Sequence, residues 1–167
     1  MKDIDIPPHD NRTLEEAQKD FFLSVNRGGA CPCCGLHAKI YKRKLYHTMV
    51  VALNHFYVHE LASSEKGRYH SVTEVLQGAA SRGGDFAKLK YWGLLEQQKE
   101  RKKDNNPRSG YWRITDKGKA FIEGKISVPA AVYVFGARAL GFSEETVQIR
   151  GSEIVMFDYN DTVNGVV

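Results

Sequence analysis

LKYWGLLE, residues 89–96, is the segment from which the fold is best predicted. Leu89 stands four residues before Gly93, and two leucines follow the glycine directly. A glycine at the end of an amphipathic stretch is typical of a helix C-terminus, because glycine adopts the left-handed conformation without a steric cost. The segment therefore predicts a helix that has Asp85 as its N-cap and ends at Gly93, followed by a strand.

SGYWRITDKGKAFIEG, residues 109–124, predicts a second strand and the next helix. We expect Thr115 to cap that helix. The intervening RKKDNNPRSG, residues 101–110, is rich in turn-forming residues and in cations, which is typical of an exposed hairpin loop. The strands on either side of the loop are therefore predicted to pair antiparallel, residues 94–100 with residues 110–115.

Helices are also predicted upstream of this hairpin. Thr13 and Glu16 form a T-x-x-E capping box ahead of apolar residues at helical spacing. A longer helix with an apolar stripe is expected over residues 43–61. Ser71 and Glu74 form a second capping box, which predicts that a short helix begins there.

A helix, a short helix, a helix and then a hairpin with a basic tip is the order of elements in a winged helix. We therefore predict an α+β protein, a winged helix-turn-helix with an N-terminal helix, a cysteine knuckle and a short β-rich C-terminal tail. The predicted division places the N-terminal arm, helix and CPCCG knuckle in residues 1–42, the winged helix in residues 43–124 and the β-rich extension in residues 125–167.

The two segments around the hairpin resemble winged-helix transcription regulators of the MarR-like kind. In those proteins a leucine four residues before a glycine precedes two aliphatic residues and a strand, and a strand ending in I/L-T-x-x-G starts the next helix. The sequence departs from them at Tyr91 and Trp92, which stand where they usually carry charged residues. The resemblance implies DNA binding, and its matching positions are Leu89, Gly93, Leu94, Leu95, Ile114, Thr115 and Gly118.

A second resemblance concerns the knuckle and the basic run after it. CPCCG and KIYKRKL, together with KYWGLLE, are similar to small bacteriophage and prophage proteins that carry no established activity. This likeness covers roughly residues 31–141. It implies a protein that works in the cytoplasm of a bacterial host cell.

The basic excess lies in one part of the chain, whose net charge is +4. Residues 81–125 hold twelve Lys and Arg against six Asp and Glu. Residues 1–80 hold ten against nine, and residues 126–167 hold two against five. A local excess of this kind is expected where a protein contacts a phosphate backbone, and the alternative is a solvated basic face.

Candidate nucleic-acid contacts come from three places. Cations at the start of a helix are disfavoured by the helix dipole, so the basic run near residue 43 indicates an anionic partner. The hairpin tip is expected to contact phosphates or the minor groove. The candidates are Arg82, Lys88 and Lys90 from the predicted recognition helix, Arg101, Lys102, Lys103 and Arg108 from the hairpin tip, and Lys42, Arg43 and Lys44 from the basic run.

The CPCCG segment contains the C-P-x-C-G turn of zinc-ribbon knuckles, in which a glycine lets backbone amides point at a thiolate. A structural zinc site has four ligands, so the turn needs two more. Two histidines spaced H-x3-H complete the set Cys31, Cys34, His55 and His59. The alternatives are a set that adds Cys33 and His37 or His47 to the two knuckle cysteines, and a tight turn that holds no metal.

The remaining features exclude several classes of protein. The three bunched cysteines do not form a disulfide framework and indicate a reducing cytosol. The N-terminus MKDIDIPPHD lacks the apolar region of a secretory signal, and no apolar run approaches the roughly 20 residues of a membrane span. We therefore expect a cytoplasmic protein without membrane contact.

No catalytic motif stands out, because G-x-S-x-G, Walker A and H-E-x-x-H patterns are absent from the sequence. We therefore expect a protein that is not an enzyme. The favoured function is a winged-helix nucleic-acid-binding protein, a phage or prophage transcriptional regulator that binds double-stranded DNA, with a homodimer as a compatible assembly. The alternative is a phage-encoded interaction module that binds and modulates a host protein.

Overall fold

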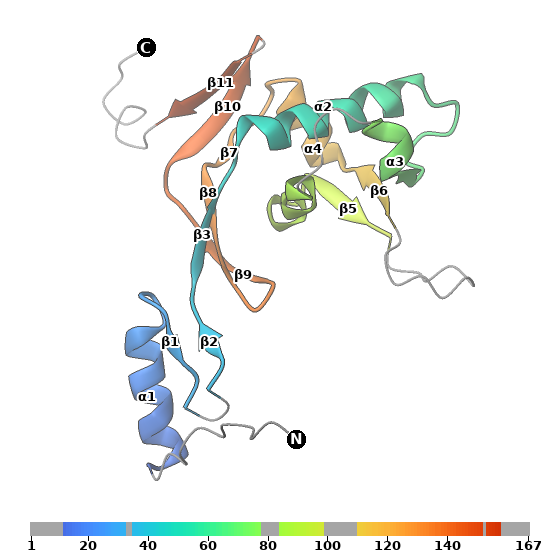
Figure 1. The fold of residues 1–167 in the computed structure, drawn as a ribbon. Helices are drawn as coiled ribbons and strands as arrows, with labels where there is room; N and C mark the ends of the chain where they lie inside the picture. Colours follow the sequence, from blue (N-terminus) through green and yellow to red (C-terminus); the bar gives the residue numbers. More distant parts are fainter. Residues whose placement is uncertain (1–11, 33–34, 78–83, 99–109, 152, 158–167) are drawn as a thin grey trace, which may run out of the picture. The chain divides into compact units, whose positions relative to one another are not determined.

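The computed structural model describes residues 12–32, 35–77, 84–98, 110–151 and 153–157. These residues form five helices and several small antiparallel sheets, so the predicted α+β class is confirmed (Figure 1). The chain divides into two units. The first comprises Met1–Arg43 and Tyr133–Gly141, and the second comprises Lys44–Val132 and Phe142–Val167.

The first unit begins with helix α1, Leu14–Ser24. Its predicted capping box is confirmed, because the Thr13 hydroxyl accepts a hydrogen bond from the Glu16 N–H and the Glu16 carboxylate accepts one from the Thr13 N–H. Strands β1 (Gly29–Ala30) and β2 (His37–Ala38) then pair antiparallel on either side of the cysteine knuckle.

A three-stranded sheet in the order β3-β8-β9 follows, formed by Tyr41–Lys44, Ala131–Phe135 and Arg138–Phe142. Gly136 (φ 53°) and Ala137 (φ 64°) join β8 to β9, and two consecutive positive φ angles are typical of a type I′ hairpin turn. In the first unit, Phe21 of α1 contacts Phe135 of β8 edge-on, with ring centroids 6.3 Å apart. This contact anchors the helix to the hairpin.

The predicted helix start at Arg43 is wrong. Residues 41–44 form strand β3, and helix α2 begins at His47 and ends at Ala62. Pairing with β8 satisfies the backbone of this strand, and the Leu45 N–H donates to the Ala130 carbonyl (2.8 Å) just beyond it. A tertiary partner distant in sequence therefore overrides the local helical pattern.

The second unit is built around α2. The elements that follow it are β4 (His70–Ser71), α3 (Val72–Val75), the 3-10 helix η1 (Asp85–Trp92), β5 (Leu95–Gln97), β6 (Tyr111–Ile114) and α4 (Asp116–Ile122). Strands β4, β6 and β5 form an antiparallel sheet in that order. The largest side chains of its core, all at most 1% exposed, are Met49, Leu53, Phe56, Leu89, Trp92, Leu94 and Phe121.

The predicted hairpin is confirmed, because Leu95 pairs with Ile114 and Gln97 pairs with Trp112. Two details of the helices differ from the prediction. Ser71 occupies the N-cap of α3, but its side chain makes no capping hydrogen bond. Gly84 rather than Asp85 is the N-cap of η1, and Asp85 instead forms an ion pair with Lys88, three residues along, which suits the three-residue period of a 3-10 helix.

The C-terminal strands form the sheet β11-β10-β7, made of Glu153–Phe157, Thr146–Arg150 and Val128–Pro129. Within the second unit, the Trp92 indole N–H donates to the Pro129 carbonyl (2.7 Å) and the Gln148 amide donates to the Gly124 carbonyl (2.6 Å). Residues 133–141 of the predicted extension belong to the first unit, and its other described residues belong to the second. Among the described residues, no helix is long and apolar enough to cross a membrane.

Candidate nucleic-acid interface

The junction of η1, β5 and α4 determines how the hairpin leaves the helices. Gly93 (φ 68°) caps η1, and the Leu94 N–H donates to the Leu89 carbonyl (3.2 Å). The Leu94 carbonyl then accepts the Thr115 N–H (3.1 Å), while the Thr115 hydroxyl donates to the Gly93 carbonyl (2.6 Å). The glycine that ends η1 is thus tied directly to the residue that caps α4.

Gly118 allows α4 to approach this junction closely. The Thr115 hydroxyl accepts the Gly118 N–H (3.0 Å), as predicted for a helix cap. A Cβ atom at position 118 would lie within 3.0 Å of both the Leu94 carbonyl oxygen and Cγ1 of Ile114 (2.8 Å). The T-x-x-G spacing therefore combines a cap with a backbone contact that only glycine permits.

Most described cations of the basic segment 81–125 are paired with acidic residues. Arg113 binds the Glu96 carboxylate through two nitrogens (3.0 and 2.8 Å). These hydrogen bonds, which outweigh the effect of burial, raise the pKa of Arg113. The other pairs are Lys88 with Asp85, Lys119 with Glu60 and Asp116, and Lys125 with Glu123. Of the described cations in this segment, Lys90 and Lys117 alone form no ion pair with a described residue.

The predicted recognition helix is therefore less basic than its sequence indicates. Lys88 is half-buried beside Asp85, whereas Lys90 is exposed and its ammonium group lies 5.4 Å from the centre of the Tyr91 ring. Arg82 lies outside the described residues. Trp92 is 1% exposed, so it serves the core rather than a binding surface.

The predicted hairpin-tip contacts cannot be placed on a surface, because residues 99–109 lie outside the described part of the chain. Arg101, Lys102, Lys103 and Arg108 therefore stay predictions from the sequence. The structure does describe both ends of the loop. There the Gln98 N–H donates to the Tyr111 carbonyl (3.0 Å), which continues the antiparallel pairing of β5 with β6. The paired strands thus position the two ends of the basic loop side by side.

The basic run belongs to strand β3 rather than to the start of a helix, so its interpretation through the helix dipole is wrong. Lys42 and Lys44 are exposed and Arg43 is half-buried. Lys42 and Arg43 belong to the first unit and Lys44 to the second. Sequence reasoning missed the aromatic partners of this strand, because Tyr133 lies about 90 residues further along the chain.

The predicted zinc ligands come from both units. Cys31 belongs to the first unit, His55 and His59 belong to α2 of the second, and Cys34 lies outside the described residues, as does Cys33. Cys31 closes a tight turn, since its N–H donates to the Leu36 carbonyl and its carbonyl accepts the Gly35 N–H (both 2.8 Å). Within the described ranges, no group of three or more His, Cys, Asp or Glu residues is arranged to hold a metal ion. Zinc binding stays a prediction.

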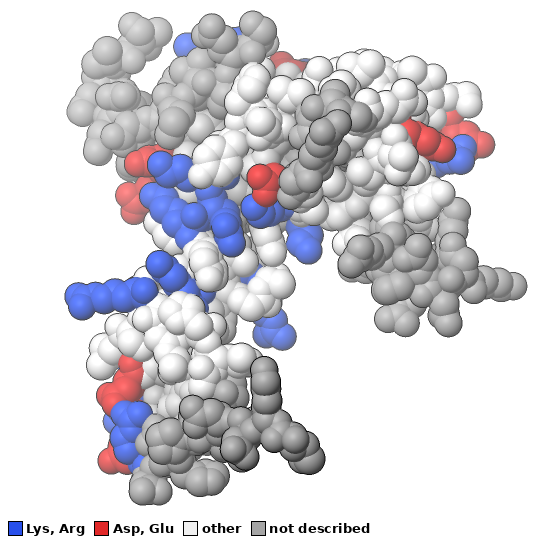
Figure 2. Space-filling view, viewed as in Figure 1, with Lys and Arg blue, Asp and Glu red and all other residues white. Residues whose placement is uncertain are grey.

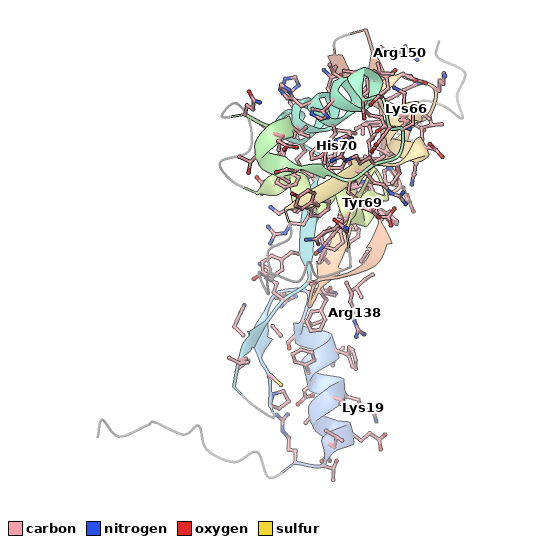
Figure 3. The ribbon with its side chains drawn as sticks, turned by 90° about the vertical axis from the view of Figure 1, so that its right-hand side faces the viewer. Lys19, Lys66, Tyr69, His70, Arg138 and Arg150 are labelled. Carbon is pink, nitrogen blue, oxygen red and sulfur yellow. The ribbon has the colours of Figure 1, made fainter. Side chains whose placement is uncertain are left out.

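A buried polar cluster, which the sequence did not reveal, lies between α2, β4 and α4. Glu60 is 2% exposed, and its carboxylate accepts the Gly67 N–H (2.8 Å) and the Lys119 ammonium (3.1 Å). His70, labelled in Figure 3, is 6% exposed; its Nε2 lies 3.6 Å from Glu60 Oε2, beyond hydrogen-bond distance. His59 packs edge-on against His70, with ring centroids 4.4 Å apart. We call Glu60, His59, His70 and Lys119 the buried polar cluster.

Burial and charge shift the pKa values in the buried polar cluster. Burial opposes ionisation of Glu60, but the hydrogen bonds from Gly67 and Lys119 outweigh it, so the pKa of Glu60 lies below its ordinary value of 4.5. Burial and the neighbouring His59 lower the pKa of His70 below 6.5, although the Glu60 carboxylate opposes this. The folded protein therefore favours the neutral form of His70 more than the unfolded chain does.

The free energy of unfolding is expected to fall as the pH decreases below about 7. Once the pH falls to about 6.5, unfolded His70 binds a proton that folded His70 does not, so protonation favours the unfolded chain until the lowered pKa is reached. The loss is at most about 1.4 kcal/mol for each pH unit inside this window. Urea unfolding at about pH 7.5 and 5.5 measures the difference, and His70→Leu should reduce it. Equal pH dependence in the wild type and the variant would contradict this origin.

Comparison with known proteins adds no family assignment, because no family model, curated protein or solved structure matches this chain.

Proposed function

We propose that the second unit is a winged helix that binds duplex DNA, as a transcriptional regulator of a bacteriophage or prophage. The observation that carries the proposal is the arrangement α2, β4, α3, η1, β5, β6 with the sheet order β4-β6-β5. Here the hairpin strand β6 lies between the short first strand and the other hairpin strand, and a helix that ends at Gly93 leads directly into the hairpin. A helix followed by a basic hairpin can contact a groove and the adjacent phosphates.

The charges of the second unit support contact by the hairpin loop more than by η1. Four of the six described cations in residues 81–125 are paired with acidic residues, and Lys90 is the exposed cation that η1 contributes. Six of the twelve cations of this segment lie in residues 78–83 and 99–109, most of them in the loop. We therefore expect phosphate contacts from the loop to dominate affinity, with little sequence discrimination.

A variant with Lys102→Ala, Lys103→Ala and Arg108→Ala tests the proposal. Duplex binding should weaken uniformly across sequences, and the slope of log affinity against log salt should become shallower by about 3, because three phosphate contacts are lost. Fluorescence anisotropy with a labelled duplex over a range of salt concentrations measures both quantities.

The matched control removes three cations that already have acidic partners: Lys19 with Glu15, Arg68 with Glu65 and Lys125 with Glu123. This K19A/R68A/K125A variant has the same net charge as the loop variant but should keep the salt slope of the wild type. A loop variant that binds duplex as tightly as the wild type would exclude the hairpin as a DNA contact.

A second function, docking on a host protein, is favoured by one observation. In η1, Trp92 is buried and Lys88 is paired with Asp85. The helix therefore presents little of the outward charge that a DNA-recognition helix uses. Under this alternative, the second unit presents η1 and the hairpin to a protein surface. Duplex binding that is absent even at low salt would support it.

A further inference from the structure

We propose that the first unit binds single-stranded nucleic acid through its strands, independently of duplex binding by the second unit. The surface consists of five cations and two tyrosines that lie on or next to the strands of that unit. We call it the strand surface, and its members are Arg27, Lys39, Tyr41, Lys42, Arg43, Tyr133 and Arg138.

Charge in the first unit is segregated between its helix and its strands. All acidic residues among the described residues of this unit, Glu15, Glu16 and Asp20, lie on α1. Two of them pair with cations at the same helix, Glu15 with Lys19 and Asp20 with Arg12. The five cations of the strand surface form no ion pair with any described residue. In Figure 2, the red side chains of the first unit lie at α1.

Such a surface attracts a polyanion, because unpaired like charges held on neighbouring strands repel one another until a counter-charge binds. Four of the five cations are exposed and Arg43 is half-buried. Arg138, labelled in Figure 3, is the first residue of β9, directly after the hairpin turn. A nucleic-acid backbone supplies phosphates at regular intervals, which matches cations that are distributed along strands rather than clustered at one point.

Two cation–aromatic pairs add a second kind of contact. The Arg43 guanidinium lies 4.6 Å from the centre of the Tyr41 ring, and the Lys42 ammonium lies 5.9 Å from the centre of the Tyr133 ring. Tyr41 nevertheless keeps 44% of its surface exposed. An exposed aromatic ring supported by a guanidinium is a platform on which a nucleic-acid base can stack.

Stacking favours a single strand over a duplex. In a duplex the faces of the bases are covered by their neighbours, so an exposed tyrosine on a sheet finds no free base face. In a single strand the bases can turn outward, stack on aromatic side chains and leave the phosphates to the cations. Successive side chains of a strand point to opposite faces, so Tyr41 and Arg43 offer a ring and a cation on one face of β3, and Lys42 offers a further cation on the other.

The strand surface is also held in place before a ligand arrives. β3 pairs with β8, the α1 residue Phe21 packs on Phe135 of β8, and the Ile40 N–H donates to the Val25 carbonyl (3.1 Å) at the end of α1. Ordered strands lose little conformational entropy on binding, which favours affinity.

The test uses the full chain and a labelled deoxythymidine oligonucleotide of about 15 nucleotides, near the upper end of the site size for such surfaces. Tyr41→Ala should weaken its binding by about tenfold, whereas Tyr41→Phe should retain it because the ring remains. The matched control is Tyr46→Ala, which removes a 58% exposed tyrosine at the N-cap of α2 in the second unit. It should bind like the wild type.

A triple variant, Lys42→Ala, Arg43→Ala and Arg138→Ala, tests the charges. The slope of log affinity against log salt for the oligonucleotide should become shallower by about 2, since each phosphate contact contributes about 0.7 for single strands. Thermal unfolding of each variant shows that the fold is retained.

The same variants distinguish this proposal from the proposed function of the second unit. Tyr41→Ala should leave duplex affinity unchanged, and the hairpin-loop variant K102A/K103A/R108A should leave oligonucleotide affinity unchanged. The proposal is overturned if Tyr41→Ala binds the oligonucleotide like the wild type, or if the wild type fails to bind it at low salt. An acidic protein partner for the strand surface would then be the better interpretation.

Discussion

Replacing Gly118 by alanine is expected to lower the free energy of unfolding of the second unit by about 3 kcal/mol, the upper end of the range for overpacking. The added Cβ would lie within 3.0 Å of the Leu94 carbonyl oxygen and 2.8 Å from Cγ1 of Ile114. The Leu94 carbonyl cannot move away without breaking its hydrogen bond with the Thr115 N–H (3.1 Å), and this bond joins α4 to β5. Alanine gains about 1 kcal/mol of helix propensity over glycine, which is too small to compensate.

The matched control is Gly110→Ala in the second unit, directly before β6, where the nearest atom to an added Cβ is Cβ of Val72 at 3.9 Å. That substitution should change stability by no more than about 0.5 kcal/mol. Urea unfolding followed by tryptophan fluorescence reports on both variants, because Trp92 and Trp112 are buried in the second unit. Equal unfolding midpoints for the two variants would show that α4 can move away from β5 at no cost.

The second large effect is expected at Glu60. Glu60→Ala should destabilise the protein by about 3 kcal/mol, the lower end of the range for breaking a buried ion pair, because Lys119 retains partial exposure (29%). The substitution leaves the Gly67 N–H without its acceptor and the Lys119 ammonium without one of its two carboxylates. Glu60→Gln keeps an oxygen for Gly67 and should cost less.

Urea unfolding near pH 7 measures these losses, and Glu65→Ala is the control. Glu65 pairs with Arg68 at the surface, with its side chain 70% exposed, so its removal should change stability by at most about 0.5 kcal/mol. The wild-type contribution of Glu60 should also disappear as the pH falls below 4.5 through the lowered pKa of the folded carboxyl, since protonation removes the charge that Lys119 neutralises. A Glu60→Ala variant as stable as Glu65→Ala would mean that Lys119 and Gly67 find other partners.

Much of the hairpin region could be predicted from the sequence, because its signals are local. Gly93, Thr115 and the turn-rich loop each act within a few residues, and the pairing of Leu95 with Ile114 follows from them. The reason for glycine at position 118 could not be predicted, because it depends on a carbonyl 24 residues earlier in the chain.

The predictions failed where a distant partner decides the local structure. Residues 41–44 form a strand because β8, about 90 residues later, pairs with them. Glu60 gives no sign of burial in the sequence, since a carboxylate near the end of an amphipathic helix ordinarily faces solvent. Its partners Gly67, His70 and Lys119 come from three different segments, so the cluster exists only in the folded chain.

The discontinuity of the first unit has a consequence for protein synthesis. Residues 12–43 leave the ribosome about 90 residues before Tyr133, so at about 5–20 residues per second α1 and β3 wait roughly 5–20 s for β8 and β9. The elements from α2 to α4 are made in one uninterrupted stretch during this interval. The part of the chain that is synthesised first therefore completes its fold only after β8 and β9 have been made, and Phe21 stays without its partner Phe135 until then.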